Sequence, residues 1–168
     1  MLVKLRSVAG VPSSVWLPAA IRAQIEDLCE AAYPLEACGV LLGVGDGEQV
    51  PWRITRLMPA PNEHGGDRRS RYLVAPTFQL SAEREAQQVG EEVVGYYHSH
   101  PDCEAVPSDC DRKQAWPGYL YLICSVVKEQ AAGLGLFALA ERGGPFYGVR
   151  VEPPPRFGET SVEIPPCP

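Results

Sequence analysis

A short apolar run at residues 37–43 places the strongest limit on the folds open to this chain. Apolar and small residues in a row, closed by a glycine, are typical of a strand buried inside a sheet. The preceding residues 18–33 carry apolar side chains at helical spacing, and Pro34 ends that pattern. A glycine-rich turn at residues 45–47 predicts a hairpin that returns along residues 51–58. We therefore expect a helix followed by a β-hairpin.

The rest of the chain contains further strand patterns and two more helical ones. We expect an exposed loop at 59–70, strands at 71–75, 93–100, 119–127, 133–140 and 146–151, and helices at 77–89 and 108–115. Because strands dominate and do not alternate regularly with helices, the pattern favours an α+β fold with a mixed sheet over regular βαβ winding. The two longer helices are expected to cover that sheet.

The length of 168 residues predicts a single domain, since domains average roughly 150 residues. We assign residues 1–151 to that domain. The remaining residues, 152–168, contain six prolines. This composition predicts an extended and poorly packed tail.

The composition disfavours several classes of function. A net charge of −6 argues against binding to a nucleic-acid backbone, which needs clustered lysine and arginine. No segment approaches the roughly 18 consecutive apolar residues of a membrane-spanning helix. The first residues lack the apolar core of a signal peptide. The six cysteines show no CxxC spacing, so we expect reduced, mostly buried thiols in a cytoplasmic protein.

Two histidines near the end of a predicted strand indicate a metal site. Side chains alternate between the two faces of a strand, so His98 and His100 project from the same face, a few ångströms apart. Two imidazoles supply half of a zinc site, and a catalytic site adds a third protein ligand and an open position for water. Asp111 follows after a loop long enough to fold back and bring its carboxylate to the same metal.

Each part of this pattern also has a purely structural interpretation. The two histidines can simply pack or form hydrogen bonds, and Ser108 with Asp111 matches a capping box at the start of a helix. Capping and metal binding are compatible, because the cap would fix the helix that presents Asp111. Another metal set also stays open, in which Cys103 and Cys110 join the two histidines in a structural zinc site.

Two charged features have roles that the residues alone leave open. Glu36 stands directly before the buried strand, either exposed at a helix–strand turn or positioned for general acid–base chemistry. Arg68, Arg69 and Arg71 lie in the predicted exposed loop or at its end. Such arginines either are solvated or contact an acidic partner.

Together these residues resemble the JAMM (MPN+) zinc metalloproteases. The segment His98-Ser99-His100-Pro101, followed by Ser108-x-x-Asp111, resembles the signature of that family, and residues 36–43 resemble its first strand with a catalytic glutamate. The resemblance spans about residues 15–151, and the short loops are similar to those of compact prokaryotic members. It implies a strongly curved mixed sheet flanked by two longer helices and a short catalytic helix, an architecture like that of cytidine deaminases.

The resemblance also implies a mechanism. His98, His100 and Asp111 would hold one Zn²⁺, with water as the fourth ligand. Glu36 would take a proton from that water and pass it to the leaving amine. Ser108 would hydrogen-bond the tetrahedral oxyanion.

The same resemblance indicates a substrate. Compact members of the family remove ubiquitin-like or sulfur-carrier proteins from lysine conjugates or from a C-terminal cysteine adduct, at the amide bond after Gly-Gly. We therefore expect a zinc-dependent isopeptidase or peptidase whose partner is such a carrier. The alternatives are a non-catalytic MPN scaffold and a cell-wall or phage-tail endopeptidase on the same fold. A zinc deaminase is disfavoured, because the sequence lacks Pro-Cys-x-x-Cys.

Overall fold

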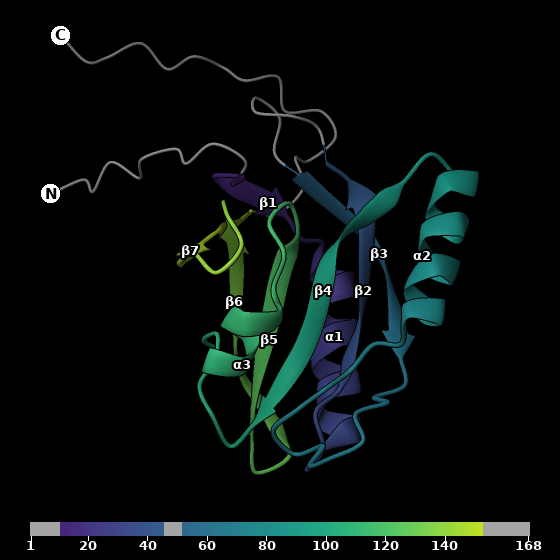
Figure 1. Cartoon of the computed structure of the whole chain (residues 1–168). Helices are drawn as coiled ribbons and strands as arrows, with labels where there is room; N and C mark the ends of the chain where they lie inside the picture. Colours follow the sequence, from purple (N-terminus) through teal and green to yellow (C-terminus); the bar gives the residue numbers. More distant parts are fainter. Residues whose placement is uncertain (1–10, 46–51, 153–168) are drawn as a thin grey trace, which may run out of the picture.

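The computed structural model describes residues 11–45 and 52–152, which form one curved sheet with its covering helices (Figure 1). Most of the predicted turn at 45–47 and nearly all of the predicted tail at 152–168 lie outside the described residues. None of the helices described is both long and apolar enough to cross a membrane.

Within those residues the structure has eight strands and three helices. The strands are β1 (Ser14–Trp16), β2 (Cys38–Val44), β3 (Trp52–Ala60), β4 (Glu92–Pro101), β5 (Leu120–Val127), β6 (Gln130–Leu139), β7 (Phe146–Gly148) and β8 (Arg150–Glu152). The helices are α1 (Ala19–Ala32), α2 (Pro76–Gln88) and α3 (Asp109–Gln114). The strands follow the order β7-β6-β5-β4-β2-β3-β1-β8. Because β4 and β5 are parallel, as are β1 and its two neighbours, while the other pairs are antiparallel, the predicted mixed sheet is confirmed.

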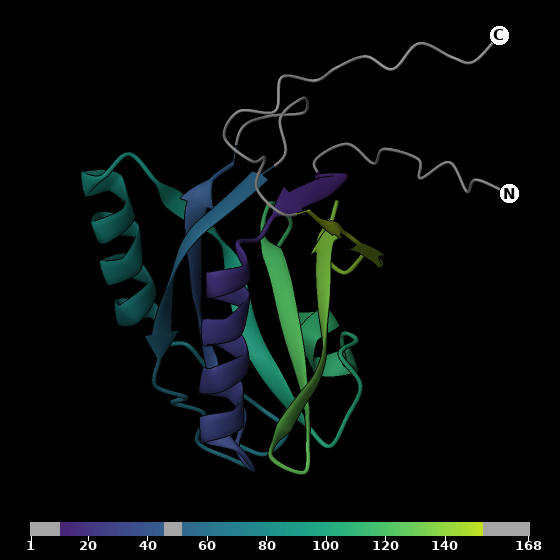
Figure 2. The ribbon, with the colours of Figure 1, turned by 180° about the vertical axis from the view of Figure 1, so that it is seen from behind.

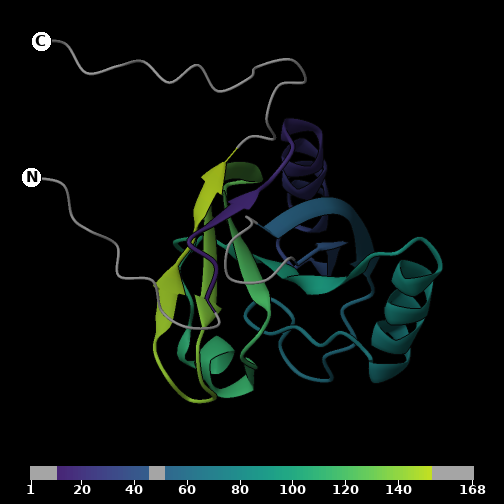
Figure 3. The ribbon, with the colours of Figure 1, turned by 90° about the horizontal axis from the view of Figure 1, so that it is seen from above.

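The two ends of this sheet meet at a single residue. β7 and β8 stand at opposite ends of the strand order, yet only Val149 separates them in the sequence. The Val149 amide donates a hydrogen bond to the Leu136 carbonyl of β6 at 2.8 Å, and the Arg150 amide donates to the Ser13 carbonyl at 3.4 Å. The sheet therefore curls until the chain can pass directly from one edge to the other, a curl that is visible from above (Figure 3).

The helices α1 and α2 cover opposite faces of the sheet. α1 lies across the face of the sheet that is seen in Figure 2. It buries its apolar stripe, including Ile25, against side chains of the central strands such as Leu41 and Leu122. On the other face, α2 packs the small residues Ala82 and Ala86 against a second apolar cluster on β2. Neighbouring residues of a strand face opposite sides, so the continuous apolar run of β2 supplies both clusters. The predicted α+β arrangement, with two longer helices over a mixed sheet, is confirmed.

Some elements differ from the sequence predictions. Residues 71–75 do not form a strand. Their backbone pairs with a side chain instead, because Asn62 donates to the Arg71 carbonyl at 3.0 Å and accepts from the Leu73 amide at 3.2 Å. The single strand predicted at 146–151 is two strands, because β7 pairs with β6 whereas β8 pairs with β1. β1 escapes the sequence analysis because three residues are too few to show an alternating pattern.

Replacing Ile25 by alanine tests the packing of α1. We expect Ile25→Ala to lower the free energy of unfolding by about 2–5 kcal/mol, because it leaves a cavity between α1 and the sheet. The control is Leu80→Ala on α2, where the side chain is 52% exposed and the expected change lies within about 0.5 kcal/mol. Urea denaturation followed by circular dichroism measures both. Equal losses in the two variants would contradict this placement of the core.

Candidate metal centre

The end of β4 brings two histidines to the side of the sheet that α2 covers. His98 pairs with Cys38 of β2, and Cys38 belongs to the apolar cluster beneath α2. His100 projects from the same face, because residues two apart on a strand share a face. Both imidazoles are buried. Buried polar groups need partners, so the neighbours of these two rings decide what they can do.

A capping box fixes the position of a buried carboxylate opposite the histidines. The Ser108 hydroxyl accepts a hydrogen bond from the Asp111 amide at 3.2 Å. In return, Asp111 Oδ2 accepts hydrogen bonds from the Ser108 amide at 2.7 Å and from the Ser108 hydroxyl at 2.6 Å. These bonds satisfy amides that the start of α3 would otherwise leave without partners. The capping role predicted for Ser108 and Asp111 is confirmed, and it holds the carboxylate near β4.

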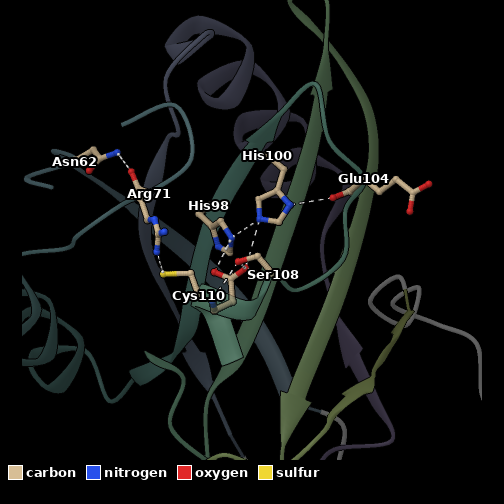
Figure 4. Close-up of polar contacts among 8 residues, drawn as sticks. Asn62, Arg71, His98, His100, Glu104, Ser108 and Cys110 are labelled. Atoms are coloured by element: carbon tan, nitrogen blue, oxygen red, sulfur yellow. Dashed lines mark hydrogen bonds and ion pairs between the residues drawn. The ribbon is translucent and has the colours of Figure 1, made fainter. Parts of the chain in front are cut away.

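His98, His100 and Asp111 converge on one point. The two Nε2 atoms of the histidines lie 3.0 Å apart, and both rings turn toward Ser108 at the start of α3 (Figure 4). Oxygens of Asp111 lie 3.3 Å from His98 Nε2 and 3.5 Å from His100 Nε2. Atoms bound tetrahedrally at about 2 Å from one zinc ion are separated by roughly 3.3 Å, so this spacing suits such an ion. In the ranges that the structure describes, no other group of three or more histidine, cysteine or acidic side chains is close enough to hold a metal.

The cysteines of the alternative zinc set lie outside this group. Cys103 is exposed, and Cys110 Sγ accepts a hydrogen bond from Nη1 of Arg71 at 2.7 Å. Cys110 precedes Asp111 on α3, and successive residues of a helix do not share a face. The structure therefore assembles the histidine–aspartate set and separates the cysteines from it.

Burial and mutual contacts set the protonation of the three side chains. Burial lowers the pKa of His98 below its ordinary value. Burial also opposes protonation of His100, but the hydrogen bonds to Asp111 and to the Glu104 carbonyl, together with the negative charges of Asp111 and Glu36, outweigh it and raise the pKa of that imidazole. Burial favours the neutral form of Asp111, yet the hydrogen bonds from His100 and His98 lower the pKa of its carboxyl far below the usual range. The group thus offers an ionised carboxylate, the form in which aspartate binds metals.

Two contacts that orient the imidazoles were not predicted from the sequence. Nδ1 of His100 lies 2.9 Å from the backbone carbonyl of Glu104, and the Tyr72 ring stacks on His98 with 4.4 Å between ring centroids. Nδ1 of His98 is buried and has no hydrogen-bond partner among the described residues, so this ring is positioned by the stacked tyrosine and by the contacts of its Nε2 with His100 and Asp111. No residue-type pattern could reveal either contact. Glu104 contributes only its backbone, and Tyr72 lies in a segment wrongly predicted as a strand.

Glu36 lies beside the metal-binding group, just beyond the start of β2. The Ala37 amide donates to Ser99 Oγ at 2.8 Å, and the Ser99 amide donates to the Ala37 carbonyl at 3.0 Å. These bonds extend the antiparallel pairing of β2 and β4 and bring Glu36 opposite His100. Glu36 is buried, unlike an exposed turn residue, with 6% of its surface accessible. Burial raises the pKa of its carboxyl to about 7, against the opposing charge of His100.

Asn62 ties the backbone of Glu36 to the loop before α2. Its Nδ2 donates to the carbonyls of both Glu36 and Arg71, at 3.0 Å each, and its Oδ1 accepts from the His64 amide at 3.1 Å. The Arg71 side chain then reaches Cys110 on α3, so this loop crosses one side of the site (Figure 4). Together the residues form a buried two-imidazole, two-carboxylate group with an arginine at its edge.

Comparison with known proteins identifies relatives with this architecture. A protein of Salinibacter ruber, solved in solution, is 34% identical, with a TM-score of 0.65 over 87% of this chain and 95% of that one. A second solution structure, of a protein from Desulfitobacterium hafniense, is 25% identical, with a TM-score of 0.69 over 86% of this chain and 97% of that one. A curated protein of Haloferax volcanii named desampylase is 42% identical over 93 residues. That match covers 55% of this chain and 63% of the desampylase.

The family comparison covers most of the fold. The family described as prokaryotic homologs of the JAB domain matches residues 18–135, from the start of α1 into β6. The match includes Glu36, both histidines, Ser108 and Asp111. It confirms the family resemblance identified from those residues. The chain therefore belongs to the family of prokaryotic homologs of the JAB domain.

Proposed function

We propose that this protein is a zinc-dependent isopeptidase or peptidase that cleaves the amide bond after the C-terminal Gly-Gly of a ubiquitin-like or sulfur-carrier protein in the cytoplasm. The observation that carries the proposal is the convergence of His98, His100 and Asp111 on one point, with the buried Glu36 beside them. Membership of the JAB family and similarity to a protein named desampylase support a hydrolase of this kind.

The donor set suits one zinc ion. Two imidazole nitrogens and one carboxylate oxygen are a common protein contribution to catalytic zinc, with the fourth position left for water or substrate. Zinc held there would polarise the scissile carbonyl and lower the pKa of a water molecule toward 7. Asp111 and the histidines supply the ligand atoms, while Tyr72 and the Glu104 carbonyl hold the rings in place.

Glu36 is the proposed general base and acid. Its carboxyl is buried beside His100, and its pKa of about 7 lets it take a proton from water and release it again near neutral pH. The water oxygen adds to the carbonyl carbon of the second glycine. Glu36 then passes the proton to the leaving nitrogen as the carbon–nitrogen bond breaks, which restores the carboxylate.

Ser108 is the proposed oxyanion donor. Its hydroxyl sits next to Asp111 and donates to that carboxylate at 2.6 Å. A serine hydroxyl hydrogen rotates freely, so the same group can turn to donate to the oxyanion of a tetrahedral intermediate. The capping box keeps the Ser108 backbone fixed while the hydroxyl changes partner.

Metal content distinguishes the proposed site from the cysteine alternative. We expect about one zinc ion per wild-type chain, measured by elemental analysis, because the three-ligand set holds a single ion. His98→Ala should remove most of that zinc. The double variant Cys103→Ser/Cys110→Ser should retain the zinc. Asp111→Asn should lose it, whereas Asp109→Ala, a matched control on the same helix, should retain it. Zinc lost with the cysteines and kept without His98 would overturn the proposed site.

Activity tests the proposed role of Glu36. Glu36→Gln keeps the shape of the side chain but cannot accept a proton, so we expect kcat to fall roughly 10²–10⁴-fold while zinc stays bound. The assay follows release of a ubiquitin-like carrier from a conjugate made through its C-terminal Gly-Gly. Glu63→Gln, an exposed glutamate in the neighbouring loop, serves as the control.

The possible outcomes separate the components of this proposal. A Glu36→Gln enzyme as fast as the wild type would exclude Glu36 as the base. A zinc-loaded wild type that leaves every Gly-Gly conjugate intact would contradict the substrate class and favour a non-catalytic scaffold.

A further inference from the structure

Arg71 lies at the edge of the candidate site, on the loop before α2. Its backbone carbonyl accepts a hydrogen bond from Asn62 Nδ2, and its guanidinium donates to Cys110 Sγ on α3 at 2.7 Å (Figure 4). Arg71 is exposed, so a ligand in the site can reach it. The side chain therefore presents a positive charge at the rim, where it contacts the residue before Asp111 on α3 and acts electrostatically on Glu36.

The guanidinium of Arg71 makes weak use of its hydrogen-bonding capacity. Arg22, Arg56, Arg112 and Arg150 each form an ion pair with a carboxylate. Over residues 11–45 and 52–152, no such ion pair involves Arg71, and the partner of its Nη1 is a thiol. A thiol is a poor acceptor, whereas the planar guanidinium fork matches a carboxylate. A carboxylate brought by a ligand would therefore displace Cys110 at little cost.

Arg71 lies on the side of the site where the leaving group must be. The proton that releases the leaving nitrogen comes from Glu36, so that nitrogen lies on the Glu36 side of the scissile carbonyl. Asn62 Nδ2 bonds to the carbonyls of both Glu36 and Arg71 at 3.0 Å, which fixes the two backbones close together. The positive charge of Arg71 also acts on the Glu36 carboxyl and opposes the rise of its pKa caused by burial. The leaving residue thus departs next to the guanidinium.

We propose that Arg71 is a specificity-determining residue, whose guanidinium binds the α-carboxylate of a single amino acid attached after Gly-Gly. Of the two kinds of substrate that the proposed function leaves open, Arg71 would thereby favour the C-terminal adduct over the isopeptide conjugate. This inference rests on the proposed hydrolytic function. Water adds to the glycine carbonyl carbon, the carbon–nitrogen bond breaks, and the proton from the water reaches the nitrogen through Glu36. The products are the carrier with a free Gly-Gly carboxylate and a free amino acid.

The charge distinguishes this substrate from an isopeptide conjugate. In a C-terminal adduct, the α-carboxylate is attached to the carbon next to the leaving nitrogen, within reach of a side chain at the rim. In an isopeptide, the leaving nitrogen is the Nζ atom of a lysine side chain. The main-chain carbonyl of that lysine belongs to a neutral peptide bond. Only the adduct therefore places a negative charge where Arg71 lies.

The test compares two forms of one substrate. A ubiquitin-like carrier ending in Gly-Gly is extended by one alanine, with either a free carboxylate or a carboxamide at its end. We expect the wild type to prefer the acid by roughly ten- to a hundredfold in kcat/KM, because hydrogen bonds to charged groups are the strong ones. Arg71→Gln should abolish this preference, and Arg71→Lys should restore part of it.

Control variants separate substrate recognition from loop structure. Arg69→Gln removes a charge from the same exposed loop and should keep the preference for the acid. Cys110→Ala breaks the contact between the loop and α3 but leaves the guanidinium, so it should also keep the preference. Binding of both forms to the Glu36→Gln enzyme, measured by titration calorimetry, should show the same acid-to-amide ratio in Kd without any turnover.

Each outcome decides between the two proposals. Cleavage of acid and amide at equal rates would overturn the role of Arg71 while leaving the hydrolase intact, and so would an acid preference that survives Arg71→Gln. If the wild type cleaves neither form nor an isopeptide conjugate, the proposed function itself fails.

Discussion

The register between β2 and β4 is the constraint on which the candidate site depends. The pairing of Cys38 with His98 brings the start of one strand to the end of the other. Two hydrogen bonds between Ala37 and Ser99 carry the pairing one residue further, so Glu36 comes to lie opposite His100. A slip of one residue would turn the histidines toward α1 and leave the carboxylate on the wrong face.

Asp111 serves structure and chemistry with the same carboxylate. It completes the capping box of α3 and also lies within 3.5 Å of both imidazoles. Burying a carboxylate is costly unless every lone pair finds a donor, and here Ser108 and the histidines supply the donors. The same hydrogen bonds therefore fix both the start of α3 and the carboxylate of Asp111, as a site with fixed geometry requires.

Patterns of residue type predicted the parts of this molecule that depend on local sequence. The stripe of α1, the apolar run of β2 and the alternation at His98 and His100 each lie within one element, and each was found. A motif linked Asp111 to the histidines and a family resemblance linked Glu36 to them, but other contacts between distant segments were not predicted, because no period or spacing encodes them. The stacking of Tyr72 on His98 and the bridging of Glu36 to Arg71 by Asn62 depend on how a loop without regular structure lies over the sheet.

The direct passage from β7 to β8 has a consequence for how the chain is made. β1 pairs with β8 across more than a hundred residues of sequence, and it also pairs with the edge of β3 that β2 leaves open. Pairings so distant along the chain form slowly, because closing a long loop costs entropy before any contact repays it. A chain emerging from the ribosome can therefore assemble α1 with the central strands, but it cannot close its sheet until residues 150–152 have been released. Until that moment β1 lacks one of its two neighbours, and this interval is when the nascent chain is most open to pairing with a foreign strand.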